Sequence, residues 1–90
     1  MEIEKNLVVT TAHMTREDSD KLNEESRFSV YSTEYWTMIH LPSLSEDTLK
    51  DYSPELRKIC HWAAEQKEGF SFIKFDADAE ELEGFKTFDW

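Results

Sequence analysis

The 90-residue sequence has one cysteine, two glycines, two prolines and no long hydrophobic run. The lone Cys60 cannot form an internal disulfide, whereas secreted domains of this size usually carry several. No apolar segment approaches the roughly 20 residues needed to cross a bilayer, and residues 1–5 lack the basic-then-apolar order of a signal peptide. The sequence therefore predicts a cytoplasmic protein that is neither exported nor membrane-spanning.

The sequence also lacks the motifs of common catalytic and cofactor sites. Two glycines can scarcely build a phosphate-binding loop, and there is no Gly-x-Ser-x-Gly elbow and no dinucleotide fingerprint. Cys60 and His61 are neighbours on a predicted helix, where adjacent side chains point about 100° apart and do not readily meet as nucleophile and base. We expect no enzyme and no cofactor; the alternative is a minor hydrolase that uses His and Asp residues and loses turnover on His13→Ala.

Metal binding is disfavoured for similar reasons. Residues 76–80 place acids at positions one, three and five of a calcium-loop pattern. Glu81 and Thr87, however, occupy the positions of the turn glycine and the bidentate glutamate. Loose binding of Mg²⁺ or Ca²⁺ to residues 76–80 is the alternative. No zinc site is expected because the three histidines lie on separate predicted elements: His13, His40 and His61.

Acidic residues are abundant and clustered. Twenty acids against ten bases give a formal net charge of −10, which disfavours direct binding to nucleic acid or membrane and favours a basic partner. One cluster, opposed only by Lys86 within the last fifteen residues, comprises Asp76, Asp78, Glu80, Glu81, Glu83 and Asp89. The other lies on a predicted helix that also carries Lys21, and comprises Glu17, Asp18, Asp20, Glu24 and Glu25.

These clusters have a functional and an ordinary interpretation. In extended backbone, alternate carboxylates lie about 6.7 Å apart, roughly two base steps, and could imitate a run of phosphates. The alternative is a solvated loop whose charge maintains solubility. Large aromatic side chains could anchor a protein interface, with Trp90 expected to be the most exposed: Tyr35, Trp36, Trp62 and Trp90.

The first half of the chain predicts a strand, a polar helix and a hairpin. Residues 7–12 are β-branched and apolar, typical of a buried, central strand. Thr15 precedes acids at a helix start, which predicts a helix over 16–25 with Leu22 as its only large apolar residue. Residues 28–41 are rich in strand formers, and we expect a hairpin bent near Ser32-Thr33.

The second half predicts a helix and two strands. Pro42 stops the preceding strand, and Ser45 can open a single helical turn. Ser53-Pro54-Glu55 is a helix start, Gly69 a helix end, and the apolar stripe between them comprises Leu56, Ile59, Cys60, Ala63 and Lys67. Strands follow at Phe70–Phe75 and Phe85–Trp90, and their short connection makes them antiparallel neighbours. The first of these is expected to bury Phe70, Phe72 and Ile73.

Together these elements predict a single α+β domain over residues 1–90. The element order is β-α-β-α-β-β, with a small, mostly antiparallel sheet of about four strands. Two helices are expected to pack on one face of that sheet.

Four stretches resemble a known protein family: TTAHMTRED (10–18), SPELR (53–57), FDAD (75–78) and TFDW (87–90). They are similar to small acidic bacterial proteins catalogued as a domain of unknown function. The resemblance covers most of the chain, supplies no catalytic residues, and implies an origin on plasmids, prophages and other mobile elements. It further implies, by analogy, a protein that disarms host defence by occupying a nucleic-acid groove.

Charge and resemblance together predict an acidic binding protein. It would inhibit a basic, nucleic-acid-binding host protein or complex, in the manner of an anti-CRISPR or anti-restriction inhibitor. The alternative is a structural or regulatory interaction module, such as an antitoxin or accessory subunit, whose partner meets an apolar sheet face or exposed aromatic side chains.

Overall fold

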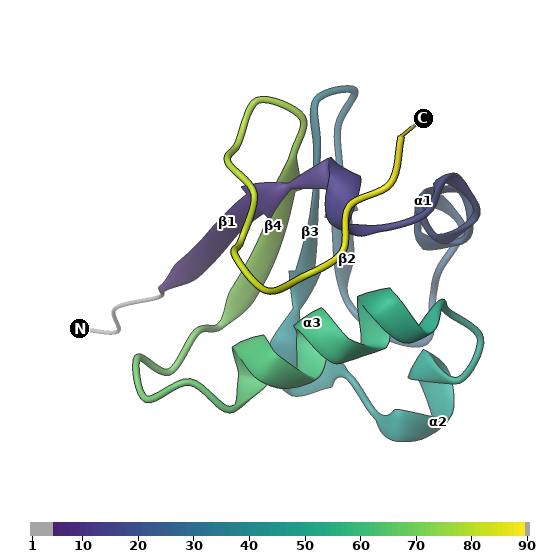
Figure 1. Ribbon diagram of the computed structural model, residues 1–90. Coiled ribbons are helices and arrows are strands. Elements are labelled where there is room, and N and C mark those ends of the chain that lie inside the picture. The colour runs from purple at the N-terminus through teal and green to yellow at the C-terminus, as the bar shows by residue number, and fades with distance from the viewer. Residues whose placement is uncertain (1–4, 90) are drawn as a thin grey trace.

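Four short strands form one mixed sheet in the order β1-β4-β3-β2 (Figure 1). The structure is a computed structural model and describes residues 5–89. Within this range no helix is long and apolar enough to cross a membrane. The elements are β1 (Asn6–Thr10), the 3₁₀ helix η1 (Thr11–His13), α1 (Arg16–Asn23), β2 (Val30–Ser32), β3 (Trp36–His40), the 3₁₀ helix η2 (Leu41–Ser43), α2 (Glu46–Leu49), α3 (Pro54–Ala64) and β4 (Phe72–Asp76).

The sheet combines a hairpin with a parallel pair. β2 and β3 pair antiparallel across a turn in which the Thr33 N–H donates to the Trp36 carbonyl at 2.8 Å, so the predicted hairpin and its bend are confirmed. β4 lies between β3, to which it is antiparallel, and β1, to which it is parallel. The parallel pair is possible because the chain between β1 and β4 is long enough for a crossover. The α+β class is therefore confirmed. The mostly antiparallel sheet and the predicted element order are matched only in part, because β3 and β2 are consecutive and residues 5–89 contain three α-helices instead of two.

Two predictions about the sheet are wrong. β1 lies at the edge and not in the centre, because β4 and β3 take the two central positions. The described part of 85–90, residues 85–89, forms no strand, so the expected antiparallel pair of final strands does not exist; Trp90 lies outside the described residues. The alternating aromatic residues of this segment pack individually instead. Phe85 contacts Trp62 of α3 with ring centroids 5.5 Å apart.

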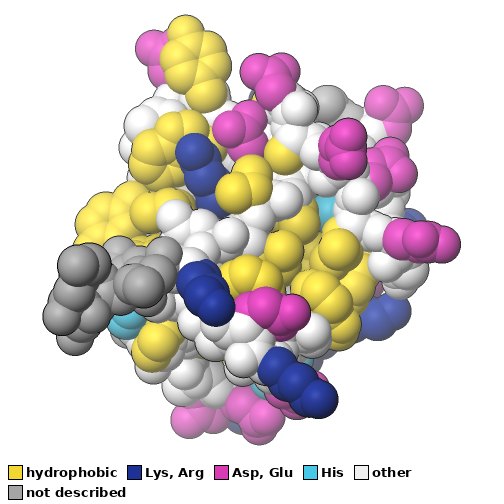
Figure 2. Space-filling view, turned by 90° about the vertical axis from the view of Figure 1, so that its left-hand side faces the viewer, with side chains coloured by type: hydrophobic (Ala, Val, Ile, Leu, Met, Phe, Trp, Pro, Cys, Tyr) yellow, Lys and Arg dark blue, Asp and Glu magenta, His cyan; other side chains and the backbone are white. Residues whose placement is uncertain are grey.

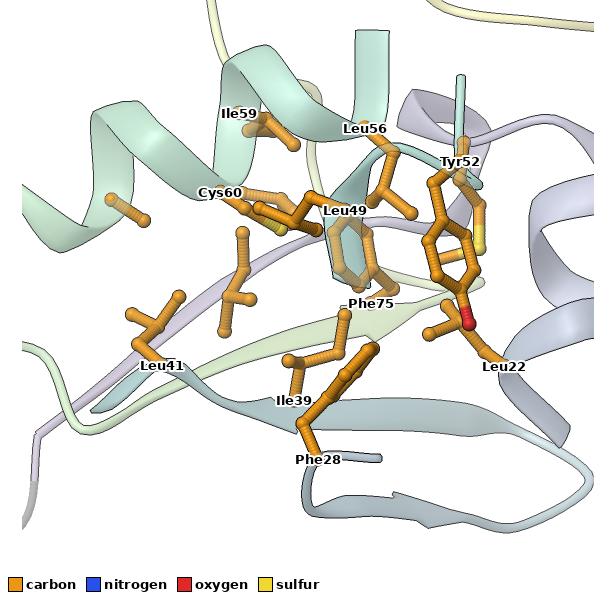
Figure 3. Close-up of a cluster of buried hydrophobic side chains, with 14 residues drawn as sticks. Leu22, Phe28, Ile39, Leu41, Leu49, Tyr52, Leu56, Ile59, Cys60 and Phe75 are labelled. Atoms are coloured by element: carbon orange, nitrogen blue, oxygen red, sulfur yellow. The ribbon is translucent and has the colours of Figure 1, made fainter. Parts of the chain in front are cut away.

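One face of the sheet and the helix α3 enclose the core (Figure 3). The predicted stripe of α3 is confirmed at four of its five positions, which are buried: Leu56, Ile59, Cys60 and Ala63. β4 buries Ile73 and Phe75, whereas Phe72 is half-buried on the opposite face and Phe70 only borders the core. The expectation is confirmed for Ile73 and met in part by Phe70, but it is wrong for Phe72, because Phe-Ser-Phe-Ile-Lys-Phe has apolar residues in both phases of the strand alternation.

A buried carboxylate joins α1 to α3. Thr15 and Asp18 form a capping box at the start of α1, with reciprocal bonds of 3.0 and 3.1 Å. The same carboxylate accepts from the Ser53 backbone N–H at 2.8 Å and from the Ser53 hydroxyl at 2.5 Å. Ser53 is itself the N-cap of α3. Asp18 therefore fixes the starts of both helices relative to each other.

His13 joins the C-terminal segment to the core. Its ring is 1% exposed and lies on η1, directly after β1. Nδ1 lies 2.9 Å from the Lys86 carbonyl, and Nε2 accepts from the Leu82 N–H at 2.8 Å. This pair of contacts requires the ring to carry its proton on Nδ1. One side chain thus holds two backbone positions of residues 77–89, which cross the α3 side of the sheet (Figure 1).

Removal of this ring is expected to loosen the C-terminal segment. In His13→Ala, two backbone groups lose a part-buried hydrogen bond and a cavity opens, so we expect the free energy of unfolding to fall by about 2–4 kcal/mol. Urea denaturation measures this loss. Hydrogen exchange should accelerate first at Leu82, and His61→Ala is the matched control because His61 is exposed. Unchanged exchange at Leu82 in His13→Ala would contradict the role of His13 as the clamp that holds the C-terminal segment.

Candidate partner-binding site

The acidic segment, defined as residues 76–89, carries five exposed carboxylates and one half-buried one. Turns at 77–78 and 83–84 interrupt it, and Gly84 has a φ of +90°, which favours glycine. The predicted row of carboxylates at regular spacing along extended backbone is therefore wrong: the charges gather around a compact loop. The exposed members are Asp78, Glu80, Glu81, Glu83 and Asp89; Asp76 is half-buried and its carboxylate accepts from the Asp78 N–H at 3.0 Å.

The backbone of this segment is attached to β1 and η1. The Thr10 N–H donates to the Glu80 carbonyl at 3.0 Å, and the Phe88 N–H donates to the Ala12 carbonyl at 2.7 Å. Leu82 and Phe85 are half-buried against the core. The carboxylates consequently project from a segment held at several points, which limits the conformational entropy lost when a partner binds.

The second predicted cluster, on and after α1, is smaller than expected. Glu17, Asp20 and Glu24 are exposed. Asp18 is 2% exposed, and its carboxylate already accepts hydrogen bonds from Thr15 and Ser53 at the starts of α1 and α3. Its prediction as a partner-binding residue is therefore wrong. The signal for its real role was the Thr-x-x-Asp spacing of a capping box. Glu25 is likewise occupied, by Arg27.

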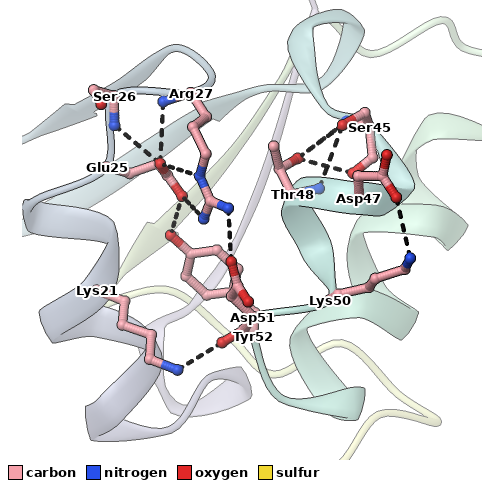
Figure 4. A network of polar contacts seen from close by, with 10 residues as sticks. All are labelled: Lys21, Glu25, Ser26, Arg27, Ser45, Asp47, Thr48, Lys50, Asp51 and Tyr52. Carbon is pink, nitrogen blue, oxygen red and sulfur yellow. Dashed lines mark hydrogen bonds and ion pairs between the residues drawn. The ribbon is translucent and has the colours of Figure 1, made fainter.

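Glu25 belongs to a polar network that ties the end of α1 to the chain before α3 (Figure 4). Its carboxylate accepts from Arg27 at 2.7 Å and from the Tyr52 hydroxyl at 2.7 Å. Arg27 also donates to Asp51 at 2.6 Å, and the Lys21 ammonium donates to the Asp51 carbonyl. The bonds from Arg27, opposed by burial, lower the pKa of Glu25 to about 2. Burial, then the bond to Glu25, raises the pKa of Tyr52.

The exposed acids of both clusters are not neutralised by ion pairs with residues 5–89. The three ion pairs found there use the carboxylates of Glu25, Asp47 and Asp51. Figure 2 shows acidic side chains gathered over the upper right part of the face in view, with basic side chains mainly in its middle and lower parts. The negative charge of this part of the surface is therefore available to a partner.

A cleft of about 500 Å³ lies between α1, η1, the hairpin turn and the acidic segment. Of its lining residues, Glu34 is the one that carries a charge, and none is basic. Several lining side chains are hydroxyls or aromatics. The lining comprises Thr10, Thr11, Ala12, Ser19, Asn23, Thr33, Glu34, Tyr35, Trp36, Thr37, Phe75, Ala77 and Phe88. Sequence reasoning missed Glu34 because it is isolated from both acidic clusters along the chain.

The sheet face opposite α3 forms a second surface, rich in aromatic residues. The His40 and Phe72 rings lie 5.0 Å apart, and Tyr31 lies 6.2 Å from Phe72. The Lys74 ammonium lies 4.8 Å from the centre of the Trp36 ring. The exposed fraction is 53% for Tyr31 and 71% for Tyr35 on the adjoining turn. Among the four aromatic residues proposed as anchors, Trp36 and Trp62 are half-buried, and Trp90 lies outside the described residues.

The candidate catalytic and metal-binding residues are separated. Cys60 is 1% exposed, and burial raises the pKa of its thiol to about 12, which keeps it protonated at neutral pH. His61 is exposed and His40 is half-buried on the open sheet face. Among residues 5–89 there is no group of three His, Cys, Asp or Glu side chains placed to hold a metal ion.

The fold and the surface thus define the class of this protein. It is a small α+β domain whose acidic segment forms no ion pairs among residues 5–89. The chain belongs to the family of unknown function DUF5983, whose C-terminal domain matches residues 6–90. This match confirms the predicted membership of a domain of unknown function. The comparisons with curated proteins and with solved structures return no match.

The Glu25 network predicts a specific dependence of stability on pH. Because the folded-state pKa of Glu25 is lowered from 4.5 to about 2, its stabilising contribution is complete above 4.5 and is lost as the pH falls toward 2. Glu25→Gln should lower the free energy of unfolding by about 1–2 kcal/mol near neutral pH. The deficit should shrink as the pH falls through this window. Urea denaturation across pH measures it, and a deficit independent of pH would contradict the assignment; exposed Glu24→Gln is the control.

Proposed function

We propose that this chain is an acidic binding protein that docks on the basic surface of a nucleic-acid-handling protein and blocks it. The observation that carries the proposal is the acidic segment. Five of its carboxylates are exposed, and none forms an ion pair with residues 5–89. Its backbone is meanwhile attached to β1, η1 and the His13 ring.

The compact form of the segment determines how it would act. A basic groove is built to receive several phosphates at once, and gathered carboxylates offer comparable charge on a pre-ordered support. Opposite charges would steer the two proteins together and make association fast and salt-dependent. Exposed aromatic side chains such as Tyr35 would lengthen the lifetime of the complex.

The biological setting belongs to the same proposal. The chain would act in the bacterial cytoplasm as a product of mobile elements, and its partner would be a restriction or CRISPR protein of the host. The support is the charge of −10 and the resemblance of four stretches of the sequence to acidic proteins of mobile elements.

A second candidate function is a structural or regulatory interaction module. It is favoured by the open sheet face, where Tyr31, Phe72 and His40 form a chain of ring contacts. Such a partner would bind mainly through apolar contact, and its affinity would depend little on salt. Salt dependence therefore separates the two functions.

Ionic strength is expected to control the association rate. The partner is captured from host lysate at low salt, purified, and mixed with the chain in stopped-flow measurements. The association rate constant should fall roughly tenfold or more between about 50 and 500 mM salt, with a smaller change in the dissociation rate constant. An association rate that is indifferent to salt would favour the second candidate.

Charge reversal of the acidic segment tests which carboxylates matter. In the double variant Glu80→Lys and Glu81→Lys, affinity for the purified partner should fall by about tenfold or more, because attraction becomes repulsion. The matched control is Glu65→Lys with Glu68→Lys, which changes the net charge equally at exposed sites before β4 instead of after it. Equal losses in the two variants would show that net charge, not this segment, governs binding.

A further inference from the structure

We infer that the cleft between α1, the hairpin turn and the acidic segment receives an arginine side chain of the basic partner. This inference rests on the proposed function and adds to it a specific contact. The acidic segment accounts for attraction at a distance, whereas the cleft offers a place where one cationic side chain can be enclosed.

The cleft is assembled from parts of the chain that are far apart in the sequence. Ser19 and Asn23 lie one helical turn apart on α1 and form one side. Residues 33–37 form another side, and Phe88 of the acidic segment also lines the cleft. At about 500 Å³ it falls within the size range of ligand-binding clefts and is larger than one side chain, which leaves room for the neighbouring backbone of a peptide.

Charge selects a cation for this cleft. Glu34 lines it, and no lining residue is basic. An anionic ligand such as a nucleotide phosphate would meet repulsion from the Glu34 carboxylate.

The aromatic rings at the cleft favour cations in particular. The Lys86 ammonium lies 5.0 Å from the centre of the Phe88 ring, and the Lys74 ammonium lies 4.8 Å from that of Trp36. Phe88 lines the cleft, whereas the Trp36 ring lies with Lys74 on the open sheet face, so of these two contacts the one at the cleft border is that of Lys86 with Phe88. Tyr35, also a lining residue, is 71% exposed and is available to a partner.

Arginine fits this lining better than lysine. Its planar guanidinium can stack on the Tyr35 ring and present five N–H donors to oxygen acceptors. The Glu34 carboxylate and the hydroxyls of Thr11 and Ser19 line the cleft as acceptors, whereas the hydroxyls of Thr10, Thr33 and Thr37 already form hydrogen bonds within the chain. The turn that carries Glu34 and Tyr35 is fixed, since the Thr33 hydroxyl accepts from the N–H groups of Tyr35 and Trp36 at 3.2 and 3.3 Å.

Three short peptides test the inference. The probe is acetyl-Gly-Arg-Gly-Arg-Gly-amide, titrated into the ¹⁵N-labelled chain and followed by amide chemical shifts; the controls carry lysine or glutamine in place of arginine. The arginine peptide should shift the amides of Thr33–Thr37, Ser19, Asn23, Ala77 and Phe88. It should bind about two- to fivefold more tightly than the lysine peptide, and the glutamine peptide should not bind.

Two tyrosines provide a matched pair of variants. Tyr35→Ala should lower the affinity for the arginine peptide by about two- to fivefold. Tyr31→Ala, at an exposed tyrosine on the open sheet face, should leave that affinity unchanged. Glu34→Gln should also weaken binding. Amide spectra of each variant establish that the fold is retained.

The outcomes separate this inference from the proposed function. Shifts confined to Glu80–Glu83, equal binding of the arginine and lysine peptides, or an unaffected Tyr35→Ala variant would each overturn the arginine cleft. Absence of peptide binding would overturn it as well. None of these results affects the charge-reversal experiment with the purified partner, which tests the proposed function independently.

Discussion

The presentation of the acidic segment depends on one buried ring. The His13 side chain has little freedom to move, because it lies on η1 directly after β1 and is 1% exposed. Because Nδ1 and Nε2 lie on opposite sides of the imidazole, one ring can hold the Lys86 carbonyl and the Leu82 N–H at the same time. Without this link, six carboxylates that repel one another would have to be held near the sheet by a few backbone bonds and two half-buried side chains. The clamp therefore opposes a repulsion that the sequence itself creates.

The chain separates structural from exposed acidic residues. Asp18 and Glu25 are enclosed and saturated with donors, and they fix α1 against the start of α3 and the chain that precedes it. Apart from half-buried Asp76, the remaining acids of both clusters face solvent, and none of them forms an ion pair among residues 5–89. A protein whose charge served only solubility would not need these acids gathered on a clamped loop beside a cleft lined by Glu34 and aromatic rings. This arrangement is what favours a cationic partner.

The extent to which the sequence predicts this structure varies with the range of the interactions. The helix from Pro54 was predictable because its cap and its apolar stripe are local, and the hairpin was predictable because strand formers flank a turn. The sequence did not predict which face of β4 is buried, since either set of alternating residues could have faced the core. The exposed acids were recognisable from composition, but the clamp was not: His13 binds backbone atoms 69 and 73 residues away. The cleft also escaped prediction, because it exists only once α1, the hairpin and residues 77–89 meet.

The central claim is that the acidic surface takes the place of nucleic acid on its partner. The most direct test is a competition experiment in which the purified partner carries fluorescently labelled nucleic acid and the chain is added at fixed ionic strength. The account predicts mutual exclusion: fluorescence anisotropy falls to the value of free nucleic acid, and the concentration of chain needed rises in proportion to the nucleic acid present. A stable ternary complex of partner, nucleic acid and chain would contradict the account.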